Sequence, residues 1–275
     1  MKKLAAGKDI VLAEKIDSTM VITFNRPDAR NAMSAALYTR CIALLAKAYA
    51  DPSVRCVVLT GAGTCFSGGR DLKERNVNRQ SAADYLEHTL FSEEGPAHFY
   101  SYLTQYRKPI ITAINGPAVA GGCIVAALGD ISIASDRAFF ALPEINRGIP
   151  PPGGVMVFPK LMSRCKGVYL LLTGEQFSAQ EAERIGMITR VVPHRKLMTE
   201  ALAVARNIGG KSPVAVRLLK TAILARQWGD DLRMNIGREA VRAIGDVTRD
   251  RIEGIQAFAE HKNPSKSKRR RRTRA

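Results

Sequence analysis

The chain has 275 residues, which suits one core domain of roughly 200 residues with a smaller appendage. Hydrophobic residues make up 46% of it, and its formal net charge of +17 favours anionic over cationic ligands. No apolar run approaches the ~20 residues of a membrane span, and the N-terminus lacks the apolar stretch of a secretory signal. We therefore expect a cytoplasmic protein that does not cross a membrane.

The first predicted elements are a strand hairpin and a helix. Residues 9–17 and 19–25 alternate apolar and polar positions, as half-buried strands do. Ser34 can then cap a helix that continues to about Ala50. The apolar face of this helix comprises Leu37, Cys41, Leu44, Leu45 and Ala48.

Two continuous apolar runs, 54–61 and 108–116, predict buried strands. Between them, residues 62–74 form a glycine-rich loop, and residues 81–107 have a helical pattern with a break at Gly95 and Pro96. A second stretch of small residues, Ala120 to Gly122, follows the second strand. Such a stretch allows the backbone to approach a ligand closely.

The remaining core elements are shorter. After a helix that ends at Leu128, residues 130–145 predict two short strands, and the chain is helical from about 155 to 173. Residues 178–187 predict a capped helix, and 188–192 a short strand.

The order strand, strand, helix occurs twice in the first half of the chain, which indicates a spiral of stacked ββα units. Helical patterns dominate after Pro193. We therefore predict an α/β fold with a spiral core (1–192), a helical C-terminal region (193–261) and a basic, disordered tail (262–275).

The five cysteines are odd in number and lack CxxC spacing, which is typical of reduced, mostly buried thiols. With only four scattered histidines, no metal site is expected. The cysteines are Cys41, Cys56, Cys65, Cys123 and Cys165.

The tail, residues 262–275, contains eight lysines or arginines and no acid, which leaves +9 on the rest of the chain. Such a tail can bind nucleic acid or an anionic surface, or it can be a solvated extension. The rest of the chain has no recognisable nucleic-acid-binding motif, so a nucleic-acid-associated protein is the weaker alternative.

Five segments carry recognisable motifs, and they occur in the order 22–34, 57–74, 108–123, 130–151 and 171–193. Together they resemble the crotonase, or enoyl-CoA hydratase/isomerase, superfamily, and the resemblance covers nearly the whole chain except the basic tail. It implies an acyl-CoA substrate, no cofactor besides the coenzyme A of that substrate, and C-terminal helices that assemble a homotrimer or hexamer.

In this family a thioester enolate is stabilised by two backbone N–H groups, each worth roughly 3–4 kcal/mol. The resemblance assigns these donors to Arg70 and Gly121. A tight helix-packing contact is the alternative explanation for Gly121 and Gly122.

The catalytic carboxylates differ from those of typical hydratases. Two-glutamate hydratases have a glutamate where this chain has Ile124, whereas the second family glutamate is present as Glu144. The resemblance therefore implies a single-glutamate acid/base, as in enoyl-CoA isomerases and hydratase-lyases. Apart from the resemblance, a glutamate after a proline is more often a solvated residue or a helix cap.

Other candidate residues follow from the same segments. A second acid or base could come from His88, Glu93, Glu94 or His98, although an exposed helical face explains these residues as well. A tyrosine reaching the site, Tyr85, Tyr100 or Tyr102, would favour a hydratase-lyase or hydrolase that acts on a bulkier, aromatic acyl-CoA. Asp71 and Asp130 are expected to be structural. Residues expected along the coenzyme A are Arg30, Asn31, Ala32, Met33, Gly68 and Lys73.

Overall fold

The computed structural model describes residues 9–71, 95–147 and 151–228. Some residues with predicted roles lie outside these ranges, namely Lys73, Tyr85, His88, Glu93 and Glu94. So do the last C-terminal helices and the basic tail.

The main sheet has six strands in the order β1-β2-β3-β4-β6-β9. The β1–β2 hairpin is antiparallel and every other pair is parallel. The predicted hairpin and buried strands are confirmed. The strands are β1 (Val11–Ile16), β2 (Thr19–Phe24), β3 (Cys56–Gly61), β4 (Ile110–Ile114), β6 (Ile131–Ser135) and β9 (Arg190–Val192).

A second, three-stranded sheet pairs β5 (Ala118–Val119) with β7 (Phe139–Ala141), and β7 with β8 (Phe177–Ser178). The sequence pattern predicted β7 but not the two outer strands. Each outer strand has only two residues, which is too short to show alternation. This small sheet fixes the turn that opens the next helix.

The first helix, α1 (Ala35–Ala50), begins where the sequence predicts, because the Ser34 hydroxyl accepts a hydrogen bond from the Leu37 amide. The part of the chain that the structure describes also contains three short 3-10 helices, η1 (Pro27–Ala29), η2 (Pro143–Arg147) and η3 (His194–Lys196). The other helices are α4 (Pro96–Gln105), α5 (Gly121–Ala127), α6 (Pro152–Leu161), α7 (Arg164–Thr173), α8 (Ala179–Arg184), α9 (Leu197–Gly209) and α10 (Pro213–Trp228).

The helical stretch predicted up to residue 173 is two helices rather than one. Met162 has extended backbone angles and ends α6. Ser163 then caps α7 by accepting a hydrogen bond from the Lys166 amide. A serine cap inside an otherwise helical pattern is the sequence signal for this break.

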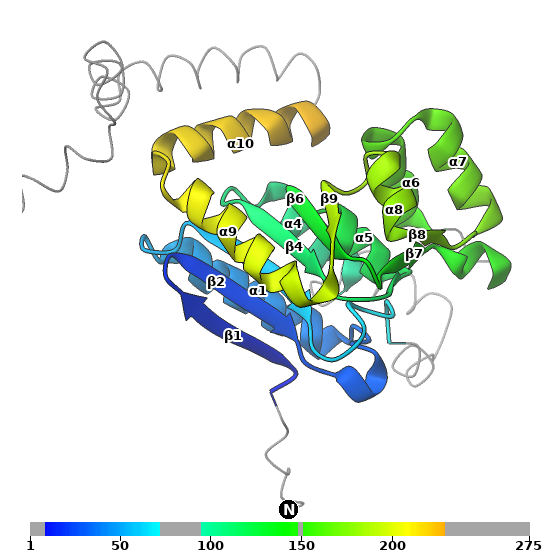
Figure 1. Ribbon diagram of the computed structural model, residues 1–275, viewed down its shortest axis with the longest axis horizontal. Helices are drawn as coiled ribbons and strands as arrows, with labels where there is room; N and C mark the ends of the chain where they lie inside the picture. Colours follow the sequence, from blue (N-terminus) through cyan, green and yellow to red (C-terminus); the bar gives the residue numbers. More distant parts are fainter. Residues whose placement is uncertain (1–8, 72–94, 148–150, 229–275) are drawn as a thin grey trace, which may run out of the picture.

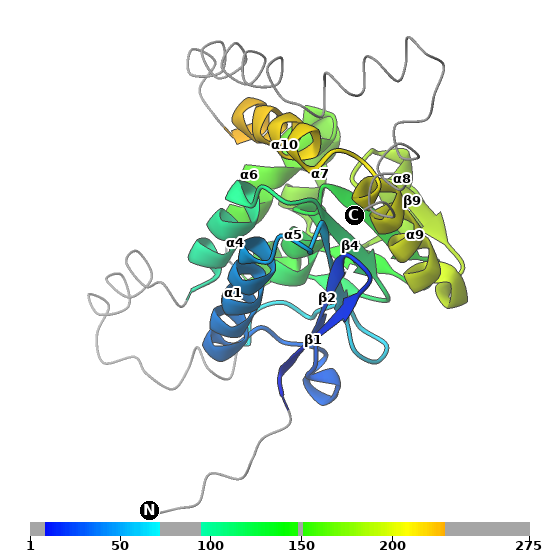
Figure 2. The ribbon, with the colours of Figure 1, turned by 90° about the vertical axis from the view of Figure 1, so that its left-hand side faces the viewer.

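Helices cover both faces of the main sheet (Figures 1 and 2). On one face α1 and α4 pack over the larger core, which includes Ile22, Val57 and Leu59. On the other face α9 packs on β3, β4 and β6 through Ala201 and Ala205. Burial on both faces explains why the central strands are apolar without interruption.

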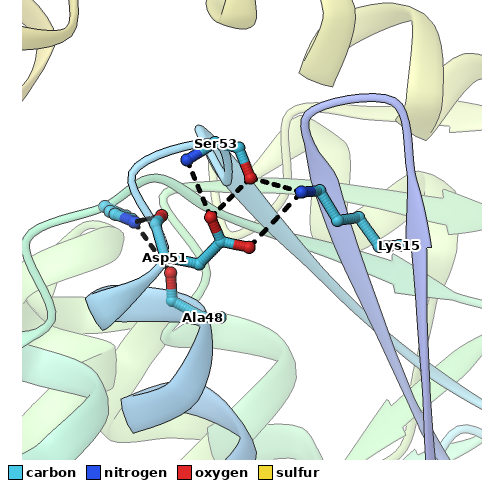
Figure 3. Close-up of polar contacts among 5 residues, drawn as sticks. Lys15, Ala48, Asp51 and Ser53 are labelled. Carbon is cyan, nitrogen blue, oxygen red and sulfur yellow. Dashed lines mark hydrogen bonds and ion pairs between the residues drawn. The ribbon is translucent and has the colours of Figure 1, made fainter.

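Buried polar contacts tie the amino ends of the strands to the helices. The Lys108 ammonium, just before β4, donates to the carbonyls of Ala48 and Asp51 at 2.7 Å each. The Asp51 carboxylate in turn accepts from Ser53 and Lys15, as Figure 3 shows. A cation at the carboxyl end of α1 also complements the helix dipole there.

Asp130 anchors the sheet, as predicted. Its carboxylate accepts from the Ile110 amide at 2.6 Å and pairs with Lys220 on α10, also at 2.6 Å. The five cysteines are free, and four of them are buried whereas Cys165 is exposed. The prediction that most of these thiols are buried is confirmed. Over the described ranges, no helix is long and apolar enough to cross a membrane.

Candidate active site

Two glycine-rich segments that are about 50 residues apart in sequence meet beside the small sheet. Ser67 pairs with Ala118 in an isolated parallel bridge. The Val119 amide donates to the Ser67 carbonyl at 2.9 Å, and the Phe66 amide to the Pro117 carbonyl at 3.0 Å. The loop after β3 and the turn before α5 are thereby held together.

Small residues are required at this meeting point. A β-carbon on Gly122 would lie 2.3 Å from the Ser67 carbonyl oxygen, far inside van der Waals contact. Gly69 has φ +90°, and a β-carbon there would lie 2.7 Å from the Ala120 β-carbon. Tight packing, the alternative explanation considered for the glycine pair, therefore accounts for Gly122.

The amide nitrogen of Arg70 lies near the turn at Gly121. On the other side of this segment, Met33 donates to the Gly69 carbonyl at 2.8 Å and accepts from the Asp71 amide at 3.0 Å. Successive peptide groups of an extended chain face opposite ways, so the Arg70 amide faces away from Met33. A β-carbon on Gly121 would lie 3.7 Å from this amide nitrogen.

Gly121 is the first residue of α5, so its amide belongs to the first turn, whose N–H groups have no partner within the helix. The preceding residue, Ala120, has φ +53°. Left-handed backbone angles are rare outside glycine. This conformation turns the chain sharply from β5 into α5, close to Gly69, whose β-carbon position lies 3.0 Å from the Gly121 amide nitrogen.

The next turn of α5 is apolar. Ile124 is 3% exposed, and its Cγ1 lies 3.1 Å from the position of a β-carbon on Gly153 in α6. Cys123 is fully buried, and burial raises the pKa of its thiol, with a smaller contribution from the charge of Glu144. Neither side chain is an acid or a base at neutral pH.

Glu144 stands at the start of η2, directly after the small sheet, and one of its carboxylate oxygens is buried. The Ala120 amide donates to the Ala141 carbonyl at 2.8 Å, three residues before Glu144. The small sheet therefore brings the start of η2 close to the turn that carries Gly121, and the Glu144 charge raises the pKa of both the Tyr100 hydroxyl and the Cys123 thiol.

Two tyrosines also line this region. Burial raises the pKa of the Tyr100 hydroxyl on α4 and of the Tyr38 hydroxyl on α1, and the two hydroxyls interact with each other. Of the candidate tyrosines, Tyr102 instead packs against Tyr106, with ring centroids 6.1 Å apart. The sequence analysis did not predict a role for Tyr38. Its position next to Leu37 in the apolar stripe of α1 could have indicated that this tyrosine is buried.

A family model described as enoyl-CoA hydratase/isomerase matches residues 14–269 of the chain. The chain belongs to this family. The match covers the whole site and confirms the assignment that the sequence motifs indicated.

Individual members of the enoyl-CoA hydratase/isomerase family are similar over most of their length. A probable mitochondrial enoyl-CoA hydratase of Dictyostelium discoideum is 33% identical over 256 residues, which cover 92% of this chain and 88% of that one. The 1,2-epoxyphenylacetyl-CoA isomerase of Escherichia coli is 31% identical over 258 residues, with coverages of 93% and 97%.

The crystal structure of an enoyl-CoA hydratase from Bacillus anthracis superposes with a TM-score of 0.84 at 30% identity. The aligned part covers 93% of this chain and 98% of that chain. The predicted crotonase-like α/β fold is thereby confirmed.

The residues expected along the coenzyme A of a family substrate fall into two groups. Arg30 and Gly68 are both exposed. A hydrogen bond from the Gly68 amide to the Arg30 carbonyl, at 2.8 Å, holds their backbones together. The Ala32 carbonyl and Asp71 both accept from Arg26, the latter in an ion pair of 2.8 Å. Asp71 is therefore structural, as expected.

Asn31 and Met33 are buried rather than open to a ligand. The Asn31 side-chain amide donates to the carbonyls of Ala62 and Cys65, at 2.9 and 2.7 Å. Its side-chain oxygen accepts from the Arg26 amide at 2.9 Å. The Asn31 side chain therefore holds two loops together. Met33 is 0% exposed, but its methyl group reaches to 3.0 Å from the β-carbon position of Gly121.

Proposed function

We propose that this acyl-CoA enzyme forms and reprotonates a thioester enolate, with the Arg70 and Gly121 amides bound to the enolate oxygen. The observation that carries the proposal is that the Arg70 amide nitrogen lies near Gly121, on the side of its segment that is not paired with the Met33 backbone. Two preorganised backbone donors in a water-excluded site stabilise a developing oxyanion strongly. Backbone donors need no particular side chain, which explains why small residues surround them.

Glu144 is the acid/base in this proposal. Its carboxylate takes a proton from a carbon next to the thioester or its double bond. The C–H electrons form the new C=C bond of the enolate, and the carbonyl π electrons move to oxygen. Return of the proton to the other end of the conjugated enolate (the γ-carbon if it left the α-carbon, the α-carbon if it left the γ-carbon) then completes an isomerisation, as the oxygen electrons re-form the carbonyl and the C=C bond moves by one position. One oxygen of the carboxylate is buried, so the group is held at the edge of the site, where a positioned acid/base is needed.

Ile124 favours isomerisation over hydration. Concerted hydration normally uses two carboxylates to hold one water, and the second position is here a buried aliphatic side chain. Tyr100 supports the alternative, a hydratase-lyase or hydrolase acting on a bulkier aromatic acyl-CoA. Its hydroxyl is a polar group that reaches the site from another segment.

The experiment that tests this function is a turnover screen with the purified full-length protein. Trans-2-enoyl, 3-enoyl and hydroxycinnamoyl thioesters of coenzyme A are offered at several chain lengths. Isomerisation of a 3-enoyl-CoA faster than hydration of the matching trans-2-enoyl-CoA supports the proposal. Cleavage of hydroxycinnamoyl-CoA as the dominant activity selects the alternative, and no turnover of any thioester contradicts both.

The variant Ile124→Glu is expected to raise hydration of crotonyl-CoA at least about tenfold, because a second carboxylate can help Glu144 to hold the attacking water. The melting temperature should fall, since a buried carboxylate is costly. Ile124→Gln has the same shape without the charge and is the matched control. If the wild-type enzyme already hydrates crotonyl-CoA as fast as it isomerises a 3-enoyl-CoA, Ile124 does not determine which of the two reactions is faster.

Self-assembly is the second expected property. Leu219 and Ile223 on α10 are 64% and 50% exposed, and Leu172 on α7 is 69% exposed. Such large apolar side chains at a surface are typical of protein interfaces. We expect a homotrimer or hexamer by sedimentation velocity at micromolar concentration, and a smaller species for Leu219→Asp with Ile223→Asp. A wild-type monomer would contradict this assignment.

A further inference from the structure

The Tyr100 hydroxyl lies beside the two proposed donor amides. A β-carbon on Gly121 would be 2.6 Å from this hydroxyl oxygen and 3.7 Å from the Arg70 amide nitrogen. The hydroxyl and the amide therefore border the same small volume next to the Gly121 backbone. A thioester oxygen bound by the two amides would lie in the neighbourhood of the hydroxyl as well.

The ring of Tyr100 is wedged between α5 and α6. Its Cε2 lies 3.5 Å from the β-carbon position of Gly153, which the Ile124 side chain also approaches. On its own helix the ring packs beside Phe99, with centroids 6.4 Å apart. Packing on several sides limits the ring to a narrow range of positions, which is the requirement for a preorganised group.

The ionisation state makes this hydroxyl a donor. Burial raises the pKa of Tyr100 above its ordinary value, and the nearby Glu144 charge acts in the same direction. The group therefore stays protonated and neutral across the pH range in which Glu144 works. A neutral phenol can donate a hydrogen bond to an oxyanion, but it does not act as a base at neutral pH.

Tyr38 stands behind Tyr100 and orients it. The Tyr38 ring packs against Phe99, the neighbour of Tyr100 on α4, with ring centroids 5.4 Å apart. Burial raises the pKa of the Tyr38 hydroxyl, and the nearby Tyr100 hydroxyl adds to this rise. The contact is looser than an ordinary hydrogen bond, since the buried Tyr38 hydroxyl meets no acceptor at standard geometry among the described residues. If the Tyr100 oxygen accepts a hydrogen bond from Tyr38, the proton of the Tyr100 hydroxyl remains available to donate to a bound thioester oxygen.

We propose that the Tyr100 hydroxyl is a third hydrogen-bond donor to the thioester oxygen, beside the amides of Arg70 and Gly121, with Tyr38 as its positioning residue. The inference rests on the proposed function and deepens it. When Glu144 removes the proton from carbon and the carbonyl electrons move to oxygen, Tyr100 strengthens its hydrogen bond to that oxygen and keeps its own proton. The step therefore needs no further reactant.

The test compares wild type with Tyr100→Phe, which retains the ring and removes only the hydroxyl. We expect kcat to fall about 10–100-fold with KM changed less than about threefold, because the lost contact strengthens in the transition state. A second readout is the red shift of a dimethylaminocinnamoyl thioester of coenzyme A on binding, which reports polarisation of its carbonyl. This shift should shrink in Tyr100→Phe and, to a smaller extent, in Tyr38→Phe.

The matched control is Tyr102→Phe, which removes a hydroxyl from the same helix at a ring that packs against Tyr106 and leaves both readouts unchanged. If Tyr100→Phe does not fold, Tyr100→Leu carries the same measurements. An unaltered red shift and kcat in the Tyr100 variant overturn the inference alone. Absence of acyl-CoA binding and turnover in wild type instead overturns the proposed function, so the two failures are distinguishable.

Discussion

Glu144→Gln should lower turnover of enoyl thioesters by about 10²–10⁴-fold, the range expected for a positioned acid/base, with folding and acyl-CoA binding close to wild type. The glutamine has the shape of the carboxylate and occupies the same place at the start of η2, but it cannot accept the proton from carbon. Since Ile124 fills the second family position, no other carboxylate is proposed to replace it. Steady-state kinetics measure the loss of turnover, and calorimetric titration with a saturated acyl-CoA measures binding separately.

The control for this substitution is Glu183→Gln, the same change at an exposed position of α8, which should leave turnover unaltered. Activity retained in Glu144→Gln would move the chemistry elsewhere. The candidates would then be the residues of the 85–102 stretch, including His88, Glu93, Glu94 and His98.

Gly122→Ala should be nearly as damaging, by a different route. The added methyl group would lie 2.3 Å from the Ser67 carbonyl oxygen, and this neighbour is backbone, so the two segments must move apart. A displacement of about 1 Å between positioned groups can cost about 10²-fold in rate. Overpacking of this kind also costs about 1–3 kcal/mol of stability. Both kcat and the melting temperature are therefore expected to fall.

Gly167→Ala in α7 is the matched control, because its β-carbon would make only ordinary contacts of 3.5–3.6 Å with Phe158 and Met162. Thermal unfolding and turnover of the two variants are measured side by side. Equal turnover of Gly122→Ala and wild type would mean that the spacing between the loop and the turn does not position the catalytic donors.

Local patterns in the sequence determined much of the framework. Alternating polarity specified the β1–β2 hairpin, and the Ser34 cap with its apolar stripe specified α1, because both depend on neighbours within one element. The glycine motifs around Gly69 and Gly121 and the order of the segments determined the family. They did so because their small residues are needed wherever two backbones approach closely.

Only the tertiary structure decided how the site is assembled. The Arg70 amide nitrogen comes to lie near Gly121 while the opposite side of its segment pairs with Met33, and no pattern near Arg70 records that partner. The Asn31 side chain binds the loop at Ala62 and Cys65, a partner more than 30 residues away that its local sequence does not indicate. Tyr38 and Tyr100 meet because α1 and α4, more than 45 residues apart, pack on the same face of the sheet. Contacts between distant segments depend on register and packing, which a single sequence does not display.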